Sequence, residues 1–138
     1  MTGSAFVDTN VVVYAFDDDE PDKQARARDL LTAPAHETLV VSTQVLAEFY
    51  VTATRKLARP LDPATARAAV AALSELPVVA TDADLVLAGI DLSERHQLSL
   101  WDGLIVQAAV AAGCETILTE DLADGALLAG VRVQNPFA

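Results

Sequence analysis

Residues 4–17 read SAFVDTNVVVYAFD and decide the fold class. The run fits either one long β-branched strand or a short strand that ends at Val7 and is followed by a helix. Asp8, Thr9 and Asn10 are poor residues for the interior of a strand and good residues for the entry to a helix. We therefore predict a strand as far as Val7, a turn at these three polar residues, and a helix after them.

Short apolar runs alternate with helical patterns along the rest of the chain. Helices are predicted at residues 21–33, 43–57, 63–76, 83–97 and 100–113, and strands at residues 38–41, 77–80, 115–119 and 131–133. Short, continuously apolar strands that alternate with helices are typical of a parallel sheet covered on both faces. The sequence therefore predicts an α/β fold with a mainly parallel sheet of about five strands.

The length of 138 residues predicts one domain spanning residues 1–138, and a hydrophobic content of 52% suffices for a core without disulfides. The single cysteine, Cys114, is interpreted as a buried thiol. The sequence starts without a basic segment followed by a long apolar one, and no later stretch is long and apolar enough to span a membrane. We therefore expect a cytoplasmic protein with no membrane partner.

The formal net charge is −11 at pH 7. Such a charge repels RNA and DNA, whose binding normally depends on neutralising phosphates. The same charge attracts metal cations and basic protein segments. Any nucleic-acid role therefore has to overcome the repulsion locally.

Four carboxylates stand where the predicted fold brings chain segments together. Asp8 follows the first strand, Asp121 follows the fourth, and Asp102 lies in the first turn of a helix. Because strand carboxyl ends and helix amino ends lie at one edge of a parallel sheet, we expect these three to converge. Glu48 lies in an apolar helix, where we expect it to be buried against the sheet with a cation as its partner.

Carboxylates gathered in this way repel one another unless a divalent ion neutralises them. Oxygen ligands without nearby histidine or cysteine favour Mg²⁺ or Mn²⁺ over zinc. Taken singly, Asp8 and Asp102 also fit helix caps, and Asp121 and Asp124 fit a turn. The combination with an acid inside an apolar helix favours the metal site.

Four separated motifs resemble the PIN-domain nucleases and, among them, the VapC-type toxins of bacterial toxin–antitoxin pairs. The motifs are FVDTNVVVYAFD at residues 6–17, AEF around Glu48, LWDGLIVQAA from Leu100 and ILTEDLADG from Ile117, and the closing GVRVQNPF is similar as well. The resemblance covers nearly the whole chain. It implies a three-layer α/β/α sandwich with a central parallel sheet, which agrees with the reading of the strand and helix pattern.

The resemblance also implies which residues form the site. The implied acidic set, both metal-binding and catalytic, is Asp8, Glu48, Asp102 and Asp121, with Thr9 and Asn10 as polar support and Asp124 as a fifth candidate ligand. Either Glu120 or Asp121 could face the site, and we favour Asp121 because Glu120 is nearer the strand end.

The activity implied by the resemblance is Mg²⁺- or Mn²⁺-dependent endoribonucleolytic cleavage of RNA. A metal held by carboxylates can activate water for attack on phosphorus and stabilise the leaving oxygen, and the sequence fits one ion as well as two. The resemblance further implies an antitoxin protein as inhibitor and a homodimer. An inhibitor could place an arginine or lysine in the carboxylate pocket while a helix covers an apolar groove.

A group of cations follows the helix that carries Glu48. Arg55 and Arg59 come seven and eleven residues after Glu48. On a continuous helix they would lie within about 20° of Glu48 around the helix axis. We hypothesise that these arginines and Lys56 guide the RNA backbone past the metal site. The alternative is a solvated helix end whose cations complement the helix dipole.

Other polar and aromatic residues are interpreted as structural. Lys23, Arg26 and Arg28 alternate with acidic residues, which is typical of a solvated helix face. Trp101, beside Asp102, is interpreted as a core or subunit-interface residue, with stacking on a base as the alternative.

Three other functions fit parts of the pattern. A phosphoacceptor receiver domain needs a lysine beyond the last strands, and the only lysines are Lys23 and Lys56. A haloacid-dehalogenase-like phosphatase needs two aspartates spaced by one residue, whereas Asp8 is followed by Asn10. A catalytically inactive PIN-like domain that only binds a basic partner remains the main alternative to a nuclease.

Overall fold

The computed structural model describes residues 3–32 and 38–138. In this part of the chain one sheet has the strand order β3-β2-β1-β4-β6-β5. The strands are β1 (Ser4–Val7), β2 (Thr38–Ser42), β3 (Val78–Val79), β4 (Thr116–Leu118), β5 (Leu127–Leu128) and β6 (Val131–Gln134). All neighbouring strands are parallel except β5 and β6. The prediction of a mainly parallel sheet is confirmed, with six strands in place of about five.

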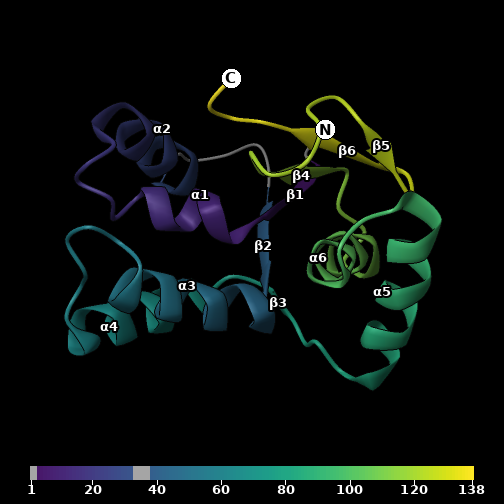
Figure 1. Cartoon of the computed structure of the whole chain (residues 1–138), viewed down its shortest axis with the longest axis horizontal. Helices are drawn as coiled ribbons and strands as arrows, with labels where there is room; N and C mark the ends of the chain where they lie inside the picture. The colour runs from purple at the N-terminus through teal and green to yellow at the C-terminus, as the bar shows by residue number, and fades with distance from the viewer. Residues whose placement is uncertain (1–2, 33–37) are drawn as a thin grey trace.

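Helices cover both faces of this sheet. They are α1 (Thr9–Tyr14), α2 (Pro21–Thr32), α3 (Thr43–Arg55), α4 (Pro63–Leu73), α5 (Ala83–His96) and α6 (Leu100–Ala111). Figure 1 shows α1 to α4 on one side of the strands and α5 and α6 on the other. The molecule is therefore the three-layer α/β/α sandwich that was predicted.

Side-chain caps explain where the helices begin. Asp8, Ser42, Asp62, Asp82 and Ser99 each precede a helix and accept a hydrogen bond from a backbone N–H of its first turn. Such caps satisfy backbone donors that have no partner within the helix. The break after Val7, on which the fold prediction depends, is therefore confirmed.

An unpredicted strand and an early helix end are the main differences from the predictions. The strand β5 was not predicted because two residues carry no periodic pattern; it pairs with β6 through a tight turn in which Ala129 and Gly130 have φ values of 50° and 84°. Helix α3 ends at Arg55 rather than near residue 57. Arg59 therefore lies beyond the helix, and the angular argument that placed it close to Glu48 around the helix axis is wrong.

The core lies on both sides of the central strands. Its largest fully buried side chains include Phe6, Phe49 and Ile117, and the Cys114 thiol is buried as predicted. Helices α5 and α6 pack closely, since a Cβ atom on Gly89 would lie 2.6 Å from Leu104 Cδ2. Among the helices of the described ranges, none combines the length and apolar character that a membrane crossing requires.

The order of the strands creates a crevice at the middle of the sheet. Strand β1 has β2 on one side and β4 on the other, and the helices that follow β2 and β3 lie on opposite faces. Ligands of open α/β sheets bind at such a switch point, outside the carboxyl ends of the strands. Asp8 follows β1 and Thr119 follows β4, so this crevice is where the candidate site lies.

Candidate functional site

Asp8 stands at the carboxyl end of β1 and is 5% exposed. Its Oδ1 atom accepts a hydrogen bond from the Thr9 backbone N–H at 2.7 Å, and its Oδ2 atom accepts one from Thr119 Oγ1 at 2.8 Å. Its own N–H donates to the Leu118 carbonyl oxygen at 3.0 Å, which joins it to β4. Both backbone and side chain of Asp8 are therefore fixed.

The electrostatics of Asp8 show that other acids are near. Burial, with smaller contributions from the charges of Asp121 and Glu48, raises the pKa of Asp8 from 3.8 to about 6. Hydrogen bonds from Thr119 and Thr9 act in the opposite direction, because they stabilise the carboxylate. The charged form of Asp8 is thus less favourable than that of an exposed aspartate, and a nearby positive charge would stabilise it.

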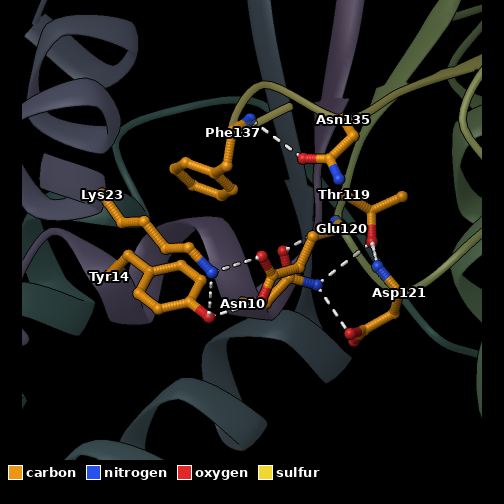
Figure 2. A network of polar contacts seen from close by, with 8 residues as sticks. All are labelled: Asn10, Tyr14, Lys23, Thr119, Glu120, Asp121, Asn135 and Phe137. Atoms are coloured by element: carbon orange, nitrogen blue, oxygen red, sulfur yellow. Dashed lines mark hydrogen bonds and ion pairs between the residues drawn. The ribbon is translucent and has the colours of Figure 1, made fainter. Parts of the chain in front are cut away.

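Asn10 links Asp8 to Asp121. Its Nδ2 atom lies 3.0 Å from Asp121 Oδ2, 3.1 Å from Thr119 Oγ1 and 3.3 Å from Asp8 Oδ2. The Asp121 N–H donates to Thr119 Oγ1 at 3.0 Å, so the same hydroxyl group contacts both aspartates. Figure 2 shows Asn10, Thr119 and Asp121 directed toward one another.

Neighbouring acids on the turn after β4 point in different directions. The Glu120 carboxylate accepts hydrogen bonds from Tyr14 and from Lys23, whose Nζ atom is 3.0 Å from Oε2. The Asp121 carboxylate instead bonds to Asn10. The structure thus places Asp121, rather than Glu120, on the side of Asp8.

Glu48 approaches the pocket from α3. Its Oε1 atom accepts a hydrogen bond from Thr9 Oγ1 at 2.8 Å, and its Oε2 atom accepts one from Gln44 Nε2 at 3.3 Å. The prediction that Glu48 is buried against the sheet is wrong. The side chain is only half-buried, because this part of α3 packs on α1 and opens to the crevice, and neutral donors satisfy the carboxylate.

Asp102 completes the acidic group from the first turn of α6. It is half-buried, and burial raises its pKa, with smaller contributions from the charges of Asp121 and Glu48. A hydrogen bond with Ser99 acts in the opposite direction. Gln44 Nε2 lies 3.3 Å from both Glu48 Oε2 and the Trp101 carbonyl oxygen, so the first turn of α6 lies beside Glu48. The charges of Asp121 and Glu48 contribute to the raised pKa of both Asp8 and Asp102, which agrees with four carboxylates in one region.

The donor set fits a hard divalent ion. It consists of carboxylate, hydroxyl and amide oxygens, which suit Mg²⁺ or Mn²⁺ better than zinc. Among the described residues, no three His, Cys, Asp or Glu side chains are arranged to hold an ion as they stand. Hydrogen bonds from Asn10, Thr9 and Thr119 hold the acids instead. The pKa values of Asp8 and Asp102 are raised mainly by burial and in smaller part by the neighbouring acids, so a bound cation would stabilise the charged form of both.

Asp124 does not join the group. Its Oδ1 atom accepts a hydrogen bond from the Asn135 N–H at 2.9 Å, which ties the loop after β4 to the segment after β6. It is absent from the charges that raise the pKa of Asp8 or Asp102. The structure thus gives Asp124 the role of a loop residue.

The three cations that follow Glu48 in the sequence lie in different surroundings. Lys56 lines a pocket of about 350 Å³ together with Thr9 and Glu48. Arg55 is exposed in the last turn of α3. Arg59 forms an exposed ion pair with Asp19, with 3.6 Å between Nε and Oδ1. Of these three cations, Lys56 is therefore the one that lines a pocket with a predicted site residue.

Most residues of α2 are exposed, as the interpretation of a solvated face predicts, but its three cations also bond to other segments. Lys23 contacts Glu120, Arg26 Nε donates to the Pro136 carbonyl oxygen at 3.1 Å, and Arg28 Nε donates to the Ala15 carbonyl oxygen at 2.8 Å. Each bond joins α2 to another segment, so the cations serve as tertiary contacts.

Two site features were missed or misread from the sequence. Thr119 is fully buried and bonds to both aspartates, yet only its position between an apolar strand and an acidic pair hinted at this role. Trp101 is 62% exposed, so it is not a core residue, and its carbonyl oxygen accepts a hydrogen bond from Gln44.

Comparison with known proteins agrees with this geometry. The model of the PIN domain family matches residues 5–123 of the chain. The chain therefore belongs to the PIN domain family, a family of nucleases, and the resemblance drawn from its motifs is confirmed. No curated protein matches the sequence.

The solved structures that resemble it include VapC-type proteins. A toxin–antitoxin complex from Klebsiella pneumoniae aligns with a TM-score of 0.71 and 22% identity, over 96% of this chain and 98% of that one. VapC20 of Mycobacterium tuberculosis, a toxin that cleaves the sarcin–ricin loop, aligns with a TM-score of 0.66 and 21% identity, over 86% and 90%. VapBC2 of Rickettsia felis, bound to promoter DNA, aligns with a TM-score of 0.65 and 22% identity, over 98% of both chains. These similarities establish the shared fold.

Proposed function

We propose that the protein is a Mg²⁺- or Mn²⁺-dependent endoribonuclease and the toxin of a toxin–antitoxin pair. The observation that carries the proposal is the convergence of Asp8, Glu48, Asp102 and Asp121 at the switch point of the sheet. Membership of the PIN domain family supports a nuclease. The similarity to VapC structures supports the role of toxin.

The chain's own residues would hold the reacting groups in place. A divalent ion, when bound, supplies activated water at neutral pH and neutralises charge on the leaving oxygen. Asp8 and Asp121 are its candidate ligands from the fixed part of the site, since Asn10 and Thr119 already orient them. Glu48 and Asp102 are candidate ligands from the half-exposed part, which an RNA strand can reach.

Lys56 and Arg55 are the candidate RNA-binding residues. Lys56 shares a pocket with Glu48, so a phosphate there would lie next to the acidic site. Arg59 contributes less under this proposal, although its exposed ion pair with Asp19 is weak enough to exchange for a phosphate. Charge reversal at Arg55 and Lys56 is expected to weaken RNA binding and to reduce its dependence on salt. Unchanged salt dependence would remove these residues from the proposal.

An antitoxin with apolar and basic residues fits the surface beside the site. A groove of about 800 Å³ between α3 and α4 is lined by apolar residues that include Leu46, Tyr50 and Val51. Val51 also lines the pocket that contains Glu48, so the groove leads toward the acids. An apolar helix in this groove could place a basic side chain among the carboxylates. The family resemblance extends the proposal to a homodimer in the cytoplasm.

A cleavage assay tests the proposed function. Purified protein and the Asp8→Asn variant are incubated with several structured RNAs in Mg²⁺, in Mn²⁺ and in a chelator. We expect cleavage by the unmodified protein with either metal and none by the variant or in the chelator. Cleavage that is indifferent to the chelator, or equal in both proteins, would contradict the proposal.

A binding domain without catalysis is the second candidate. It is favoured by one observation: neutral hydrogen-bond donors already satisfy Asp8, Glu48 and Asp121 in this structure. Under this alternative the protein binds a basic partner and cleaves no RNA with either metal.

A further inference from the structure

The turn after β4 carries two adjacent acids that have separate partners. Figure 2 shows the Glu120 side chain directed toward Tyr14 and Lys23, and the Asp121 side chain directed toward Asn10. Asn10 also holds the backbone of this turn, because its Oδ1 atom accepts the Glu120 N–H at 3.2 Å. The position of the Asp121 carboxylate therefore depends on how Glu120 is held.

Lys23 is the cation that holds Glu120. Its Nζ atom lies 3.0 Å from Glu120 Oε2 and 3.2 Å from the Tyr14 hydroxyl oxygen. The same atom is 4.7 Å from the centre of the Tyr14 ring and 5.8 Å from that of Phe137. The two rings pack edge to face, with 5.0 Å between their centres. Lys23 therefore contacts α1, the turn after β4 and the carboxyl-terminal segment, while its side chain stays about 34% exposed.

From this geometry we infer that Lys23 is a positioning residue for Asp121. By binding Glu120, it keeps this acid away from the crevice and fixes the turn in which Asp121 bonds to Asn10. In a chain of net charge −11, an unpaired Glu120 would repel the neighbouring carboxylates and loosen the turn. Tyr14 alone would then hold Glu120, through a single neutral hydrogen bond.

The inference deepens the proposed function, on which it rests where it takes Asp121 as a metal ligand. It predicts the direction in which removal of Lys23 changes the affinity for a cation. Removal of any lysine makes the protein more negative, which by long-range attraction strengthens the binding of a cation. Loss of a residue that orients a ligand weakens binding, typically by about 10-fold or more. A variant of Lys23 separates these two effects.

The first experiment needs no metal. Hydrogen exchange of the Glu120 and Asp121 amides is measured by NMR in the metal-free protein and in Lys23→Met, which keeps an unbranched apolar side chain beside the two rings but removes the charge. We expect exchange of both amides to accelerate at least about fivefold, because their hydrogen bonds open more often. Exchange in the α6 core, such as at Ala109, is expected to stay unchanged. Unchanged exchange at the turn, or equal acceleration in α6, would overturn the inference.

The second experiment measures Mn²⁺ binding by calorimetry. Lys23→Met is expected to bind Mn²⁺ about 10-fold more weakly, and Lys23→Arg, which keeps the charge and the donors, to recover most of the affinity. Arg95→Met is the matched control, since it removes one exposed cation from the last turn of α5. Its affinity is expected to stay equal or to increase slightly. Equal or tighter binding by Lys23→Met would overturn the inference.

The two experiments distinguish this inference from the proposed function. If the unmodified protein binds no Mn²⁺, the proposed metal site fails. Accelerated exchange at the turn in Lys23→Met would then still support the inference that Lys23 fixes this turn by binding Glu120. If Mn²⁺ binds equally to the unmodified protein and to Lys23→Met, the metal site stands and the role of Lys23 in it is overturned.

Discussion

Asp8 and Asp121 share two hydrogen-bond partners, whereas Glu48 shares only Thr9 with Asp8, and the Ser99 partner of Asp102 bonds to no other acid of the site. Asn10 and Thr119 each contact both Asp8 and Asp121. Glu48 bonds to Thr9 and Gln44, and Asp102 bonds to Ser99, on separate helices. The first pair is interlocked at the ends of two adjacent strands. The second pair is half-exposed, and its two members share no hydrogen-bond partner with each other.

This difference indicates that the two pairs of carboxylates have different roles in the pocket. The interlocked pair is already oriented, so binding a cation there requires little rearrangement. The half-exposed pair can adjust when a cation or RNA strand enters from solvent. Changes in the interlocked pair should therefore have larger effects than changes around the half-exposed pair, and the following predictions test that order.

The largest effect is expected for Asp8→Asn. Removal of this carboxylate eliminates a fixed candidate ligand, and we expect the rate of RNA cleavage to fall about 1,000-fold, equivalent to about 4 kcal/mol of transition-state stabilisation. Single-turnover cleavage at saturating Mg²⁺ measures it. Asp124→Asn is the control, with a rate within about twofold of the unmodified protein, because Asp124 bonds to Asn135 instead. Equal losses in both variants would contradict the assignment.

The next largest effect is expected in the pH dependence of the unfolding free energy. The pKa of Asp8 is raised from 3.8 to about 6 in the folded protein. Between these values the folded state binds more protons than the unfolded state, so the contribution of Asp8 to stability is present at low pH and is lost as pH rises. We expect the metal-free unfolding free energy to fall by about 2 kcal/mol from pH 4 to pH 7, relative to Asp8→Asn.

Urea denaturation of both proteins across this pH range provides the measurement. Saturating Mn²⁺ should flatten the difference, because a bound cation stabilises the charged carboxylate. A difference between the proteins that does not vary with pH would show that Asp8 is not destabilised by its burial.

Thr119→Val is expected to have a somewhat smaller effect. Valine keeps the shape but removes the hydroxyl group that donates to Asp8 and accepts from Asp121. Unfolding free energy should decrease by about 1 to 2 kcal/mol, and Mn²⁺ affinity by about 10-fold. Thr65→Val removes a similar but exposed bond to Asp62 and should change stability by less than about 0.5 kcal/mol. Similar losses in the two variants would deny Thr119 a special role.

The smallest effect is expected for Gln44→Ala, in the half-exposed part. Its 3.3 Å bond to Glu48 is partly exposed, and Thr9 still holds the other carboxylate oxygen. We expect cleavage within about threefold of the unmodified protein and stability within about 0.5 kcal/mol. A loss as large as that of Thr119→Val would remove the distinction between the two pairs.

The fold was largely predictable because its signals are local. Asp8, Ser42 and Ser99 interrupt apolar runs at the positions where caps are favoured, and each does cap a helix. The strand β5 was not predictable, since its two residues acquire their conformation from pairing with β6. The end of α3 at Arg55 was similarly set by tertiary packing, because the Leu61 N–H bonds back to the Ala53 carbonyl oxygen.

The site was predictable as a set of acids but not as a network. The positions of Asp8, Asp102 and Asp121 at element ends predicted their convergence from topology alone. The roles of Thr119 and Lys23 depend on partners that are 111 and 97 residues away in the sequence. Neither residue type is unusual in its local context, so no local pattern could reveal these contacts.

The location of a bound divalent ion is the most direct test of the proposed metal site. A crystal structure of the protein with Mn²⁺, examined by anomalous scattering, would show where the ion lies. We expect an anomalous peak at the carboxyl ends of β1 and β4, from an ion coordinated by Asp8 and at least one of Asp121, Asp102 and Glu48. A protein saturated with Mn²⁺ elsewhere, or with no ion at these carboxylates, would contradict it.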